Sequence, residues 1–202
     1  MIELRNVSIG FVQKLLLDNV YIEFSSGRLT ALIGRNGSGK STLLKAISGI
    51  NEKFTGEILI EDTDIRKIPK HRLAKKLAFV NTQRPRMARL KCFDVVALGR
   101  SPHTGWNGKL SAIDKQMAEE ALQLIGMPEY SHRYFNSLSD GESQKIMIAR
   151  AIAQETDIII LDEPTSFLDL PTRHEMASLL RSLCHDHGKT IIFSTHELDI
   201  AR

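Results

Sequence analysis

The sequence predicts an α/β fold in which a mostly parallel sheet is interrupted by a helical insert. Three observations support this class. An apolar, strand-like run at 29–33 leads into a glycine-rich loop and then a helical pattern. Short apolar, β-branched runs return at 158–161 and 190–193, as expected of strands buried on both faces of a parallel sheet. Between these parts, from about residue 84 to residue 154, apolar residues recur at helical spacing.

The elements can be justified in chain order from periodicity and turn residues. Strands are expected at 2–7, 19–24, 28–33, 56–60, 77–81, 158–161 and 190–193, and helices at 41–47, 94–100, 112–125, 142–153 and 172–187. Ser25-Ser26-Gly27 is a predicted turn, and Gly188 is expected to stop the last helix. We therefore expect the 202 residues to form a single domain, with a core of 1–83 and 155–202 that is split by a helical subdomain at 84–154.

Composition and charge place the chain among ordinary globular proteins. It is 42% hydrophobic and 25% charged, with a net charge of +3, which does not call for a nucleic-acid partner. Cys92 and Cys184 have no metal-binding spacing, so we expect two reduced thiols. The N-terminus starts directly with a strand pattern and no apolar run is long enough to span a bilayer. We therefore expect a cytosolic protein, or one peripheral on a cytosolic membrane face.

The segment Gly34-Arg35-Asn36-Gly37-Ser38-Gly39-Lys40-Ser41 fits the phosphate-binding loop pattern G-x-x-x-x-G-K-[ST] at every fixed position. Its glycines let backbone N–H groups approach a triphosphate, and the helix N-terminus that follows favours an anion. Lys40 would reach the β/γ-phosphates and Ser41 would bind Mg²⁺. A chance glycine-rich turn would not show this strand–loop–helix context. The predicted nucleotide-binding residues are Gly34, Asn36, Gly37, Ser38, Gly39, Lys40, Ser41 and Thr42.

Two further strands end in polar residues that suit phosphate chemistry. Asp162 and Glu163 follow the apolar strand 158–161, so Asp162 fits a Mg²⁺ ligand and Glu163 fits a base that orients or deprotonates water. His196 follows the strand at 190–193. Because parallel strands bring their carboxyl ends to one crevice, His196 is expected near the γ-phosphate. An acidic turn and a structural histidine are the alternatives, and the upstream phosphate loop disfavours both.

The remaining motifs resemble those of ATP-binding cassette (ABC) ATPases. Leu138-Ser139-Asp140-Gly141-Glu142 is similar to the family signature, Asn81-Thr82-Gln83 to its glutamine switch, Ser166-Phe167-Leu168-Asp169 to its dimer-contact loop, and Ser194-Thr195-His196 to its histidine switch. Phe11 stands where the family often stacks an aromatic ring on adenine. The resemblance implies a phosphate-loop NTPase core, an antiparallel β subdomain and an inserted α-helical subdomain.

The resemblance also implies a mechanism. Two copies would bind ATP between them, one providing its phosphate loop and the other its signature residues Ser139, Gly141 and Glu142. Catalysis would use Glu163 as base and His196 as the γ-phosphate contact. Gln83 would join Ser41 and Asp162 around Mg²⁺ and report to the helical subdomain. Asp140 and Glu142 depart from the family's glycine and glutamine, and Asp140 is expected to point away from the triphosphate.

A third departure from the family is length, because the chain stops six residues after His196. The family usually continues with more strands and a closing helix, so we expect a missing C-terminal part and an uncovered sheet edge.

The segment 93–103 and the run 114–127 resemble importers of iron–siderophore, haem and cobalamin. The resemblance implies partners: a multi-span membrane permease that docks on the insert, and a substrate-binding protein. An ABC ATPase that acts on ribosomes or DNA remains the alternative. The basic run 66–76 could favour nucleic acid, but such a run more often forms one solvated helix face, here near the membrane surface. A guanine-reading motif is absent from the sequence and the signature does not suit a small-molecule kinase, so a GTPase switch and a kinase are disfavoured. A binding module without hydrolysis is disfavoured because both acids are present.

Overall fold

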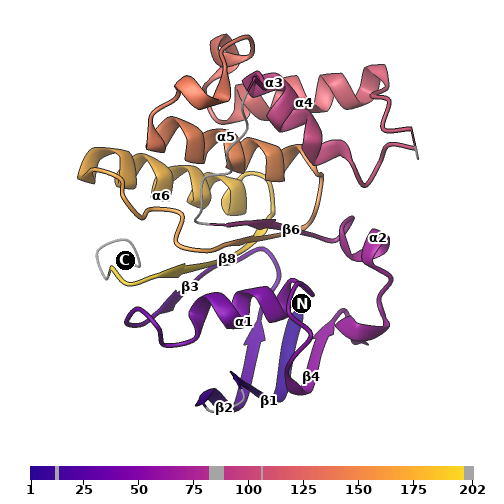
Figure 1. Cartoon of the computed structure of the whole chain (residues 1–202), viewed down its shortest axis with the longest axis vertical. Coiled ribbons are helices and arrows are strands. Elements are labelled where there is room, and N and C mark those ends of the chain that lie inside the picture. The colour runs from indigo at the N-terminus through magenta and orange to yellow at the C-terminus, as the bar shows by residue number, and fades with distance from the viewer. Residues whose placement is uncertain (12–13, 82–88, 106, 198–202) are drawn as a thin grey trace.

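The computed structural model describes residues 1–11, 14–81, 89–105 and 107–197. Strands in this part of the chain form two four-stranded sheets, and helices cover the outer face of one of them (Figure 1). The antiparallel sheet has the order β2-β1-β4-β5 and the parallel sheet the order β3-β8-β7-β6. Their bounds are β1 Ile2–Phe11, β2 Lys14–Phe24, β3 Leu29–Ile33, β4 Thr55–Ile60, β5 Thr63–Asp64, β6 Leu77–Val80, β7 Ile158–Leu161 and β8 Thr190–Thr195.

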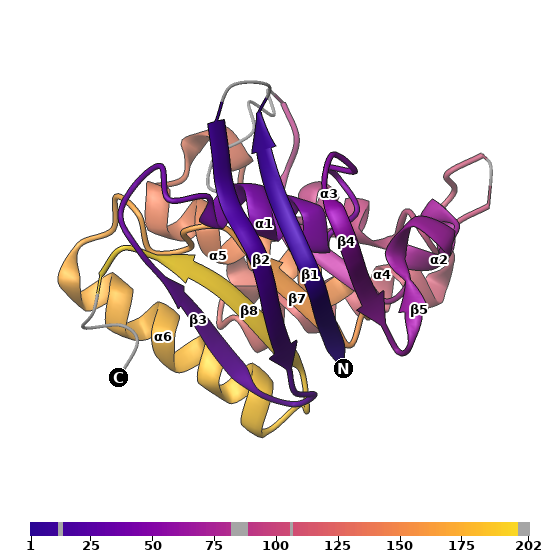
Figure 2. The same ribbon diagram turned by 90° about the horizontal axis from the view of Figure 1, so that it is seen from below.

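The helices fall into an inner and an outer group. Helix α1 (Lys40–Ile47) lies between the two sheets, as Figure 2 shows from the side of the antiparallel sheet. The outer group covers the other face of the parallel sheet. It comprises α3 Cys92–Ala97, α4 Ala112–Leu124, α5 Asp140–Ala153 and α6 Leu170–His185. The described part of the chain also contains a short α2 (Lys70–Leu73) and the 3₁₀ turns η1 Ile65–Lys67, η2 Leu98–Arg100, η3 Pro128–Tyr130 and η4 Phe135–Ser137.

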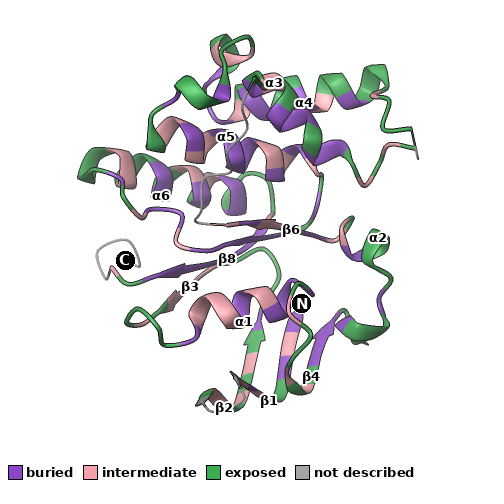
Figure 3. Cartoon of the chain, in the orientation of Figure 1, coloured by how far each residue is buried: buried purple, intermediate pink, exposed green. Residues whose placement is uncertain are grey.

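The parallel sheet separates two apolar cores. On one face, Leu44 and Ile47 of α1 pack among Ile2 and Ile58 of the antiparallel sheet and Ile160 of β7. On the other face, the outer helices pack over the alternate residues of the same strands. Figure 3 shows these buried residues following the central strands and the inward helix faces. Because strands β7 and β8 are covered on both sides, their near-continuous apolar sequence is explained.

The register of the parallel sheet determines where the functional side chains emerge. Leu161 of β7 pairs with Phe193 of β8, and Ile33 of β3 pairs with Thr195. The three strands therefore end at the same edge, where the polar residues after them can meet. This confirms the predicted α/β class with an antiparallel β part and a helical part.

Several predicted boundaries were wrong. β1 and β2 are longer than expected because bulges carry the pairing past Asn6, whose φ of 53° breaks the simple alternation. Helix α5 begins at Asp140 rather than at 142, since the Ser139 side chain caps it. Helix α6 spans Leu170–His185, two residues earlier than predicted, because Asp169 caps it. The expected helix 94–100 is divided into α3 and η2. Strand β5 was not predicted, and α2 lies within the basic run 66–76, where a solvated helix face was expected.

Candidate active site

The phosphate loop joins β3 to α1 and leaves its backbone open. Gly37 and Gly39 have φ of 79° and 97°, in the left-handed region that favours glycine. Gly39 is the N-cap of α1 and provides no capping side chain, and the first turn of α1 holds no acidic residue. The helix N-terminus therefore presents unpaired N–H groups and its positive dipole end to the cavity in front of it.

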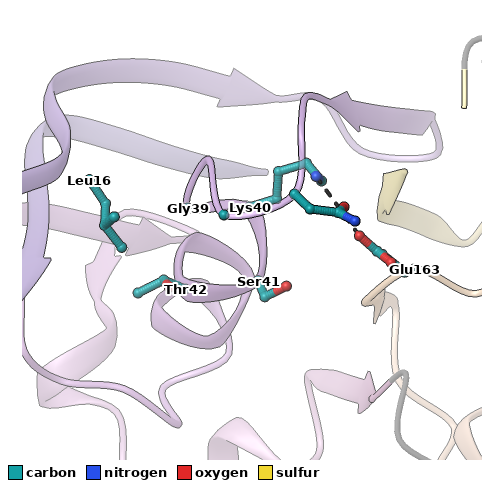
Figure 4. Close-up of a pocket in the computed structure, with 8 residues that line it drawn as sticks. Leu16, Gly39, Lys40, Ser41, Thr42 and Glu163 are labelled. Atoms are coloured by element: carbon teal, nitrogen blue, oxygen red, sulfur yellow. Dashed lines mark ion pairs between the residues drawn. The ribbon is translucent and has the colours of Figure 1, made fainter. Parts of the chain in front are cut away.

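That cavity has a volume of about 380 Å³ and is lined by the phosphate loop together with Leu16 of β2 and Glu163 (Figure 4). It brings together most of the predicted loop residues with Glu163 from the end of β7 and one residue that sequence reasoning missed, Leu16 of β2. The lining residues are Leu16, Asn36, Gly37, Gly39, Lys40, Ser41, Thr42 and Glu163.

Lys40 points back along its own loop. Its Nζ donates to the carbonyl oxygens of Gly34 at 2.7 Å and Arg35 at 3.1 Å. The same nitrogen lies 3.9 Å from Glu163 Oε1, an ion pair marked in Figure 4. The Lys40 side chain is only 9% exposed, so these carbonyl oxygens replace the water that its ammonium group would otherwise bind. A phosphate oxygen in the cavity would offer this ammonium a stronger, charged partner.

Asp162 is fixed by two hydroxyl groups. Its Oδ1 accepts hydrogen bonds from Ser41 Oγ at 2.8 Å and from Ser194 Oγ at 2.7 Å. The carboxylate is only 3% exposed. Ser194 also accepts a hydrogen bond from the Glu163 N–H at 2.9 Å, so one hydroxyl of β8 orients both acids. Sequence reasoning quoted Ser194 within a motif but assigned it no role.

Glu163 occupies a constrained position at the end of β7. Its backbone φ of 47° lies in the left-handed region, which a non-glycine residue enters only when its surroundings impose it. Ser166 Oγ donates to its Oε2 at 2.7 Å, and Nδ1 of His196 lies 3.7 Å from its Oε1. Glu163 and His196 therefore meet beside the loop, as predicted, and Ser166 is an additional partner.

The predicted signature residues line a different cavity. Ser139, Gly141 and Glu142, with Asp140 between them, form one wall of a hollow of about 450 Å³. The other wall is the loop before α6 and the first turns of that helix, from Phe167 to Glu175. A Cβ at Gly141 would lie 2.8 Å from Thr172 Cγ2, so Thr172 would have to shift. This hollow and the phosphate-loop cavity share no lining residue.

Glu142 is engaged within its own chain. Its Oε1 accepts from Tyr130 Oη at 2.6 Å and its Oε2 from the Ser139 N–H at 2.8 Å, while Arg133 lies 3.8 Å away. The Tyr130 hydroxyl is the main cause that lowers the pKa of the Glu142 carboxyl. The departure from glutamine thus gives an anionic cap for α5. The prediction that Glu142 contacts nucleotide stays open.

Two predicted site residues cannot be placed. Gln83 lies outside the described residues, as does the side chain of Phe11 at the end of β1.

The oxygens of Ser41 and Asp162 suit a magnesium ion. Mg²⁺ takes oxygen ligands and is usually bound by one or two carboxylates together with substrate phosphates. The hydroxyl and the carboxylate meet at 2.8 Å beside the phosphate loop, so both could turn to a shared ion. The donor set therefore fits the group that the sequence predicts.

The fold and this cavity define a nucleoside-triphosphatase of the phosphate-loop class. The sequence profile described as "ABC transporter" matches residues 17–166 of the chain. The chain therefore belongs to the ABC transporter family and is an ATP-binding, ATP-hydrolysing cassette of that family.

Individual relatives are also ATP-binding proteins of ABC transporters or of named transport systems. The achromobactin transport ATP-binding protein CbrD of Dickeya dadantii is 35% identical over 197 residues, which cover 98% of this chain and 73% of the relative. The iron(3+)-hydroxamate import ATP-binding protein FhuC of Bacillus subtilis is 34% identical over the same shares.

Solved structures agree too. A transporter assigned to the metal-chelate type, in an inward-facing conformation, superposes with a TM-score of 0.87 at 32% identity, over 98% of this chain and 74% of the other. A dimeric cassette, MJ0796, bound to ADP and phosphate, gives a TM-score of 0.83 at 29% identity, over 100% of this chain and 90% of the other. Among the described residues, we find no helix with the length and apolar character needed to cross a membrane.

Proposed function

We propose that this chain energises an importer of an iron chelate, such as a siderophore or haem, or of cobalamin. The relatives named for achromobactin transport and for iron(3+)-hydroxamate import, at 34–35% identity over almost the whole chain, support an iron-chelate cargo. In this proposal two copies dimerise on ATP, dock on a multi-span permease at the cytoplasmic face of the membrane, and receive cargo from a substrate-binding protein. Residues 1–83 and 155–202 form the nucleotide-binding core, and 84–154 the subdomain that contacts the permease.

The proposal of ATP hydrolysis rests on the hydrogen bonds around the two acids. Ser41 of the phosphate loop bonds to Asp162, and Ser194 bonds to both Asp162 and the Glu163 N–H. On binding, Lys40 exchanges the Gly34 and Arg35 carbonyls for phosphate oxygens. Ser41 and Asp162 would hold Mg²⁺, which supplies neutralising charge on the phosphates. Glu163, oriented by Ser166, accepts the proton of the attacking water.

His196 contacts the γ-phosphate on the same edge, and Gln83 completes the metal site. Phe11 stacks on adenine, and the partner copy closes the site with Ser139 and Gly141 at the start of α5. Because that site lies between copies, the separate signature cavity of a single chain supports the dimer.

The isosteric substitution Glu163→Gln tests the base. Gln keeps an oxygen for the Ser166 hydroxyl but cannot take a proton at neutral pH. We expect turnover to fall by about 10²-fold or more, with ATP affinity changed less than about twofold. Glu129→Gln, the same change at an exposed residue of η3, serves as the matched control. Near-normal hydrolysis by Glu163→Gln, measured as phosphate release, would defeat the assignment.

The transport part is tested on the protein as it occurs in the cell. The chain is isolated from detergent-solubilised native membranes and its stoichiometric companions are identified. A multi-span membrane protein, with ATPase activity stimulated by a binding protein, is the expected result. Recovery only with ribosomes or DNA would overturn the importer and leave the ATPase intact.

A further inference from the structure

A buried arginine joins three segments at the far end of the signature helix. Arg100, in η2, is 3% exposed. Its Nε donates to Asp114 Oδ1 in the first turns of α4 at 3.0 Å. Its Nη1 donates to the Ala153 carbonyl at the last turn of α5, at 2.7 Å, and to Glu155 Oε2 at 2.6 Å. A guanidinium can satisfy several acceptors at once because its donors form a fixed, planar fork.

The backbones of η2 and α5 are also in close contact beside Arg100. A Cβ on Gly99 would lie 2.1 Å from the Arg150 carbonyl oxygen, so η2 lies directly against the backbone of α5. Figure 1 shows α3 and α4 stacked over α5 on this side. We call the contacts of Arg100 with Asp114, Ala153 and Glu155, together with the packing of Gly99 against Arg150, the α5 joint.

On its other side, the end of α5 is attached to the core. Gln154 Nε2 donates to the carbonyl of Ala74, just before β6, at 2.7 Å and to that of Leu77, the first residue of β6, at 3.0 Å. His103 Nε2 lies 2.9 Å from the Gln154 carbonyl oxygen. The C-terminal end of α5 is therefore held both by the helical part of the chain and by the parallel sheet.

The opposite end of α5 carries Ser139 and Gly141, the residues that the proposed function places on the partner's nucleotide. The helix has 14 residues, so these groups lie about 21 Å from the joint. A tilt of about 5° at the joint would move them by about 2 Å over that length. Misplacement of a contacting group by about 1 Å is enough to cost about 10²-fold in rate.

We propose that Arg100 is a positioning residue of the ATPase: by clamping the C-terminal end of α5, it sets where Ser139 and Gly141 lie on the partner's nucleotide. This inference rests on the proposed function, since it needs the two-copy site. Arg100 itself touches neither nucleotide nor reacting atoms in this arrangement.

The test uses Arg100→Lys, which keeps a positive charge beside Asp114 but loses the fork that reaches Ala153 and Glu155 together. Arg5→Lys is the matched control, since Arg5 forms a comparable two-bond pair with Glu3 on the solvent-facing side of β1. Three quantities are measured: kcat for ATP, the ATP concentration for half-maximal dimerisation in a Glu163→Gln background, and ADP affinity. ADP binding reports the phosphate loop alone.

We expect Arg100→Lys to lower kcat about tenfold and to raise the ATP concentration for dimerisation about tenfold, with ADP affinity changed less than about twofold. Arg5→Lys should leave all three at the wild-type values. Unchanged kcat and dimerisation in Arg100→Lys would overturn the proposal. An equal loss of ADP affinity would also overturn it, because the phosphate loop itself would then have been disturbed.

A second variant decides the matter if Arg100→Lys does not fold. Glu155 has a half-exposed side chain and a φ of 54°, a conformation that asparagine tolerates well. Asparagine at position 155 is too short to accept the hydrogen bond from Arg100. We expect Glu155→Asn to lower kcat about threefold and to raise the ATP concentration for dimerisation about threefold. Wild-type values in this variant would overturn the joint's role. If the Glu163→Gln reference chain itself fails to dimerise with ATP, the proposed function fails instead.

Discussion

Replacing Gly99 with alanine tests the close backbone contact between η2 and the end of α5. The added Cβ would lie 2.1 Å from the Arg150 carbonyl oxygen and 3.3 Å from the Gln154 nitrogen. Both are backbone atoms of α5, so neither can swing away as a side chain would. Real contacts of this kind are not found below 3.0 Å, so η2 and α5 would have to separate by about 1 Å.

The cost can be estimated from that overlap. Overpacking a well-filled interior costs about 1–3 kcal/mol, and an overlap between two backbones belongs at the upper end, about 3 kcal/mol. For a chain of 202 residues, each kcal/mol shifts Tm by about 2–4 °C, so a fall of about 6–12 °C is expected. Thermal unfolding followed by far-ultraviolet circular dichroism measures this shift, and urea unfolding measures the free energy directly.

Gly105→Ala is the matched control. Gly105 has no left-handed φ, and its nearest neighbour to an added Cβ is Asn107 Oδ1 at 3.7 Å, an ordinary contact. We expect no loss, or a gain of about 0.4–1 kcal/mol from the stiffer unfolded chain. A Gly99→Ala protein that melts within about 1 °C of Gly105→Ala would refute the close packing of η2 on α5.

Two other predictions follow from the buried polar groups. Ser194→Ala leaves the Glu163 N–H without its acceptor and removes a hydrogen-bond donor from Asp162. We expect the free energy of unfolding in urea to fall by about 1–3 kcal/mol and phosphate release to slow. Wild-type values of both quantities would contradict the role of Ser194 in orienting the two acids. The Ser111 hydroxyl and N–H, with the Arg100 guanidinium, hold the pKa of Asp114 at about 2, below its ordinary 3.8. Because the pKa of Asp114 is lower in the folded chain than in the unfolded chain, ionised Asp114 stabilises the fold at pH values above its unfolded pKa. This stabilisation is lost as the pH falls through the pKa of the folded state. The stability difference between wild type and Asp114→Asn should therefore shrink between about pH 4 and pH 2, and a constant difference would contradict the pairing.

The sequence was sufficient for the residues whose positions a motif determines. The loop from Gly34 to Ser41, the acids Asp162 and Glu163, and His196 were predicted and lie together at one sheet edge. They could be found because a strand end followed by a polar residue places that residue at the crevice of a parallel sheet. Their catalytic roles remain predictions.

Residues whose position depends on strand register could not be found in this way. Ser194 reaches both acids only because Leu161 pairs with Phe193, and no local pattern specifies that pairing. Leu16 enters the cavity from β2, a strand of the other sheet. The start of α5 was different, because Ser139 and Glu142 already carry the S-x-x-E pattern of a capping box. Because Ser139 and Glu142 were interpreted only as nucleotide contacts, this capping pattern was not used to predict that α5 begins at Asp140.

The position of the joint follows from how the two halves of the site are connected. The chain leaves α5 at Gln154, turns through Glu155, and enters β7 only three residues later, at Ile158. Thr156 in this link is 1% exposed, its hydroxyl bonds to the Ile158 carbonyl at 2.9 Å, and its own carbonyl accepts from Lys189 at 2.8 Å.

This short link, with the Gln154 contacts to Ala74 and Leu77, holds the C-terminal end of α5 to the parallel sheet. A change in the tilt of α5 would therefore appear mainly at its opposite end, where Ser139 and Gly141 lie. An arginine that holds the C-terminal end of α5 acts on those residues and leaves the acids of the phosphate-loop cavity in place, which is why ADP affinity is the decisive control.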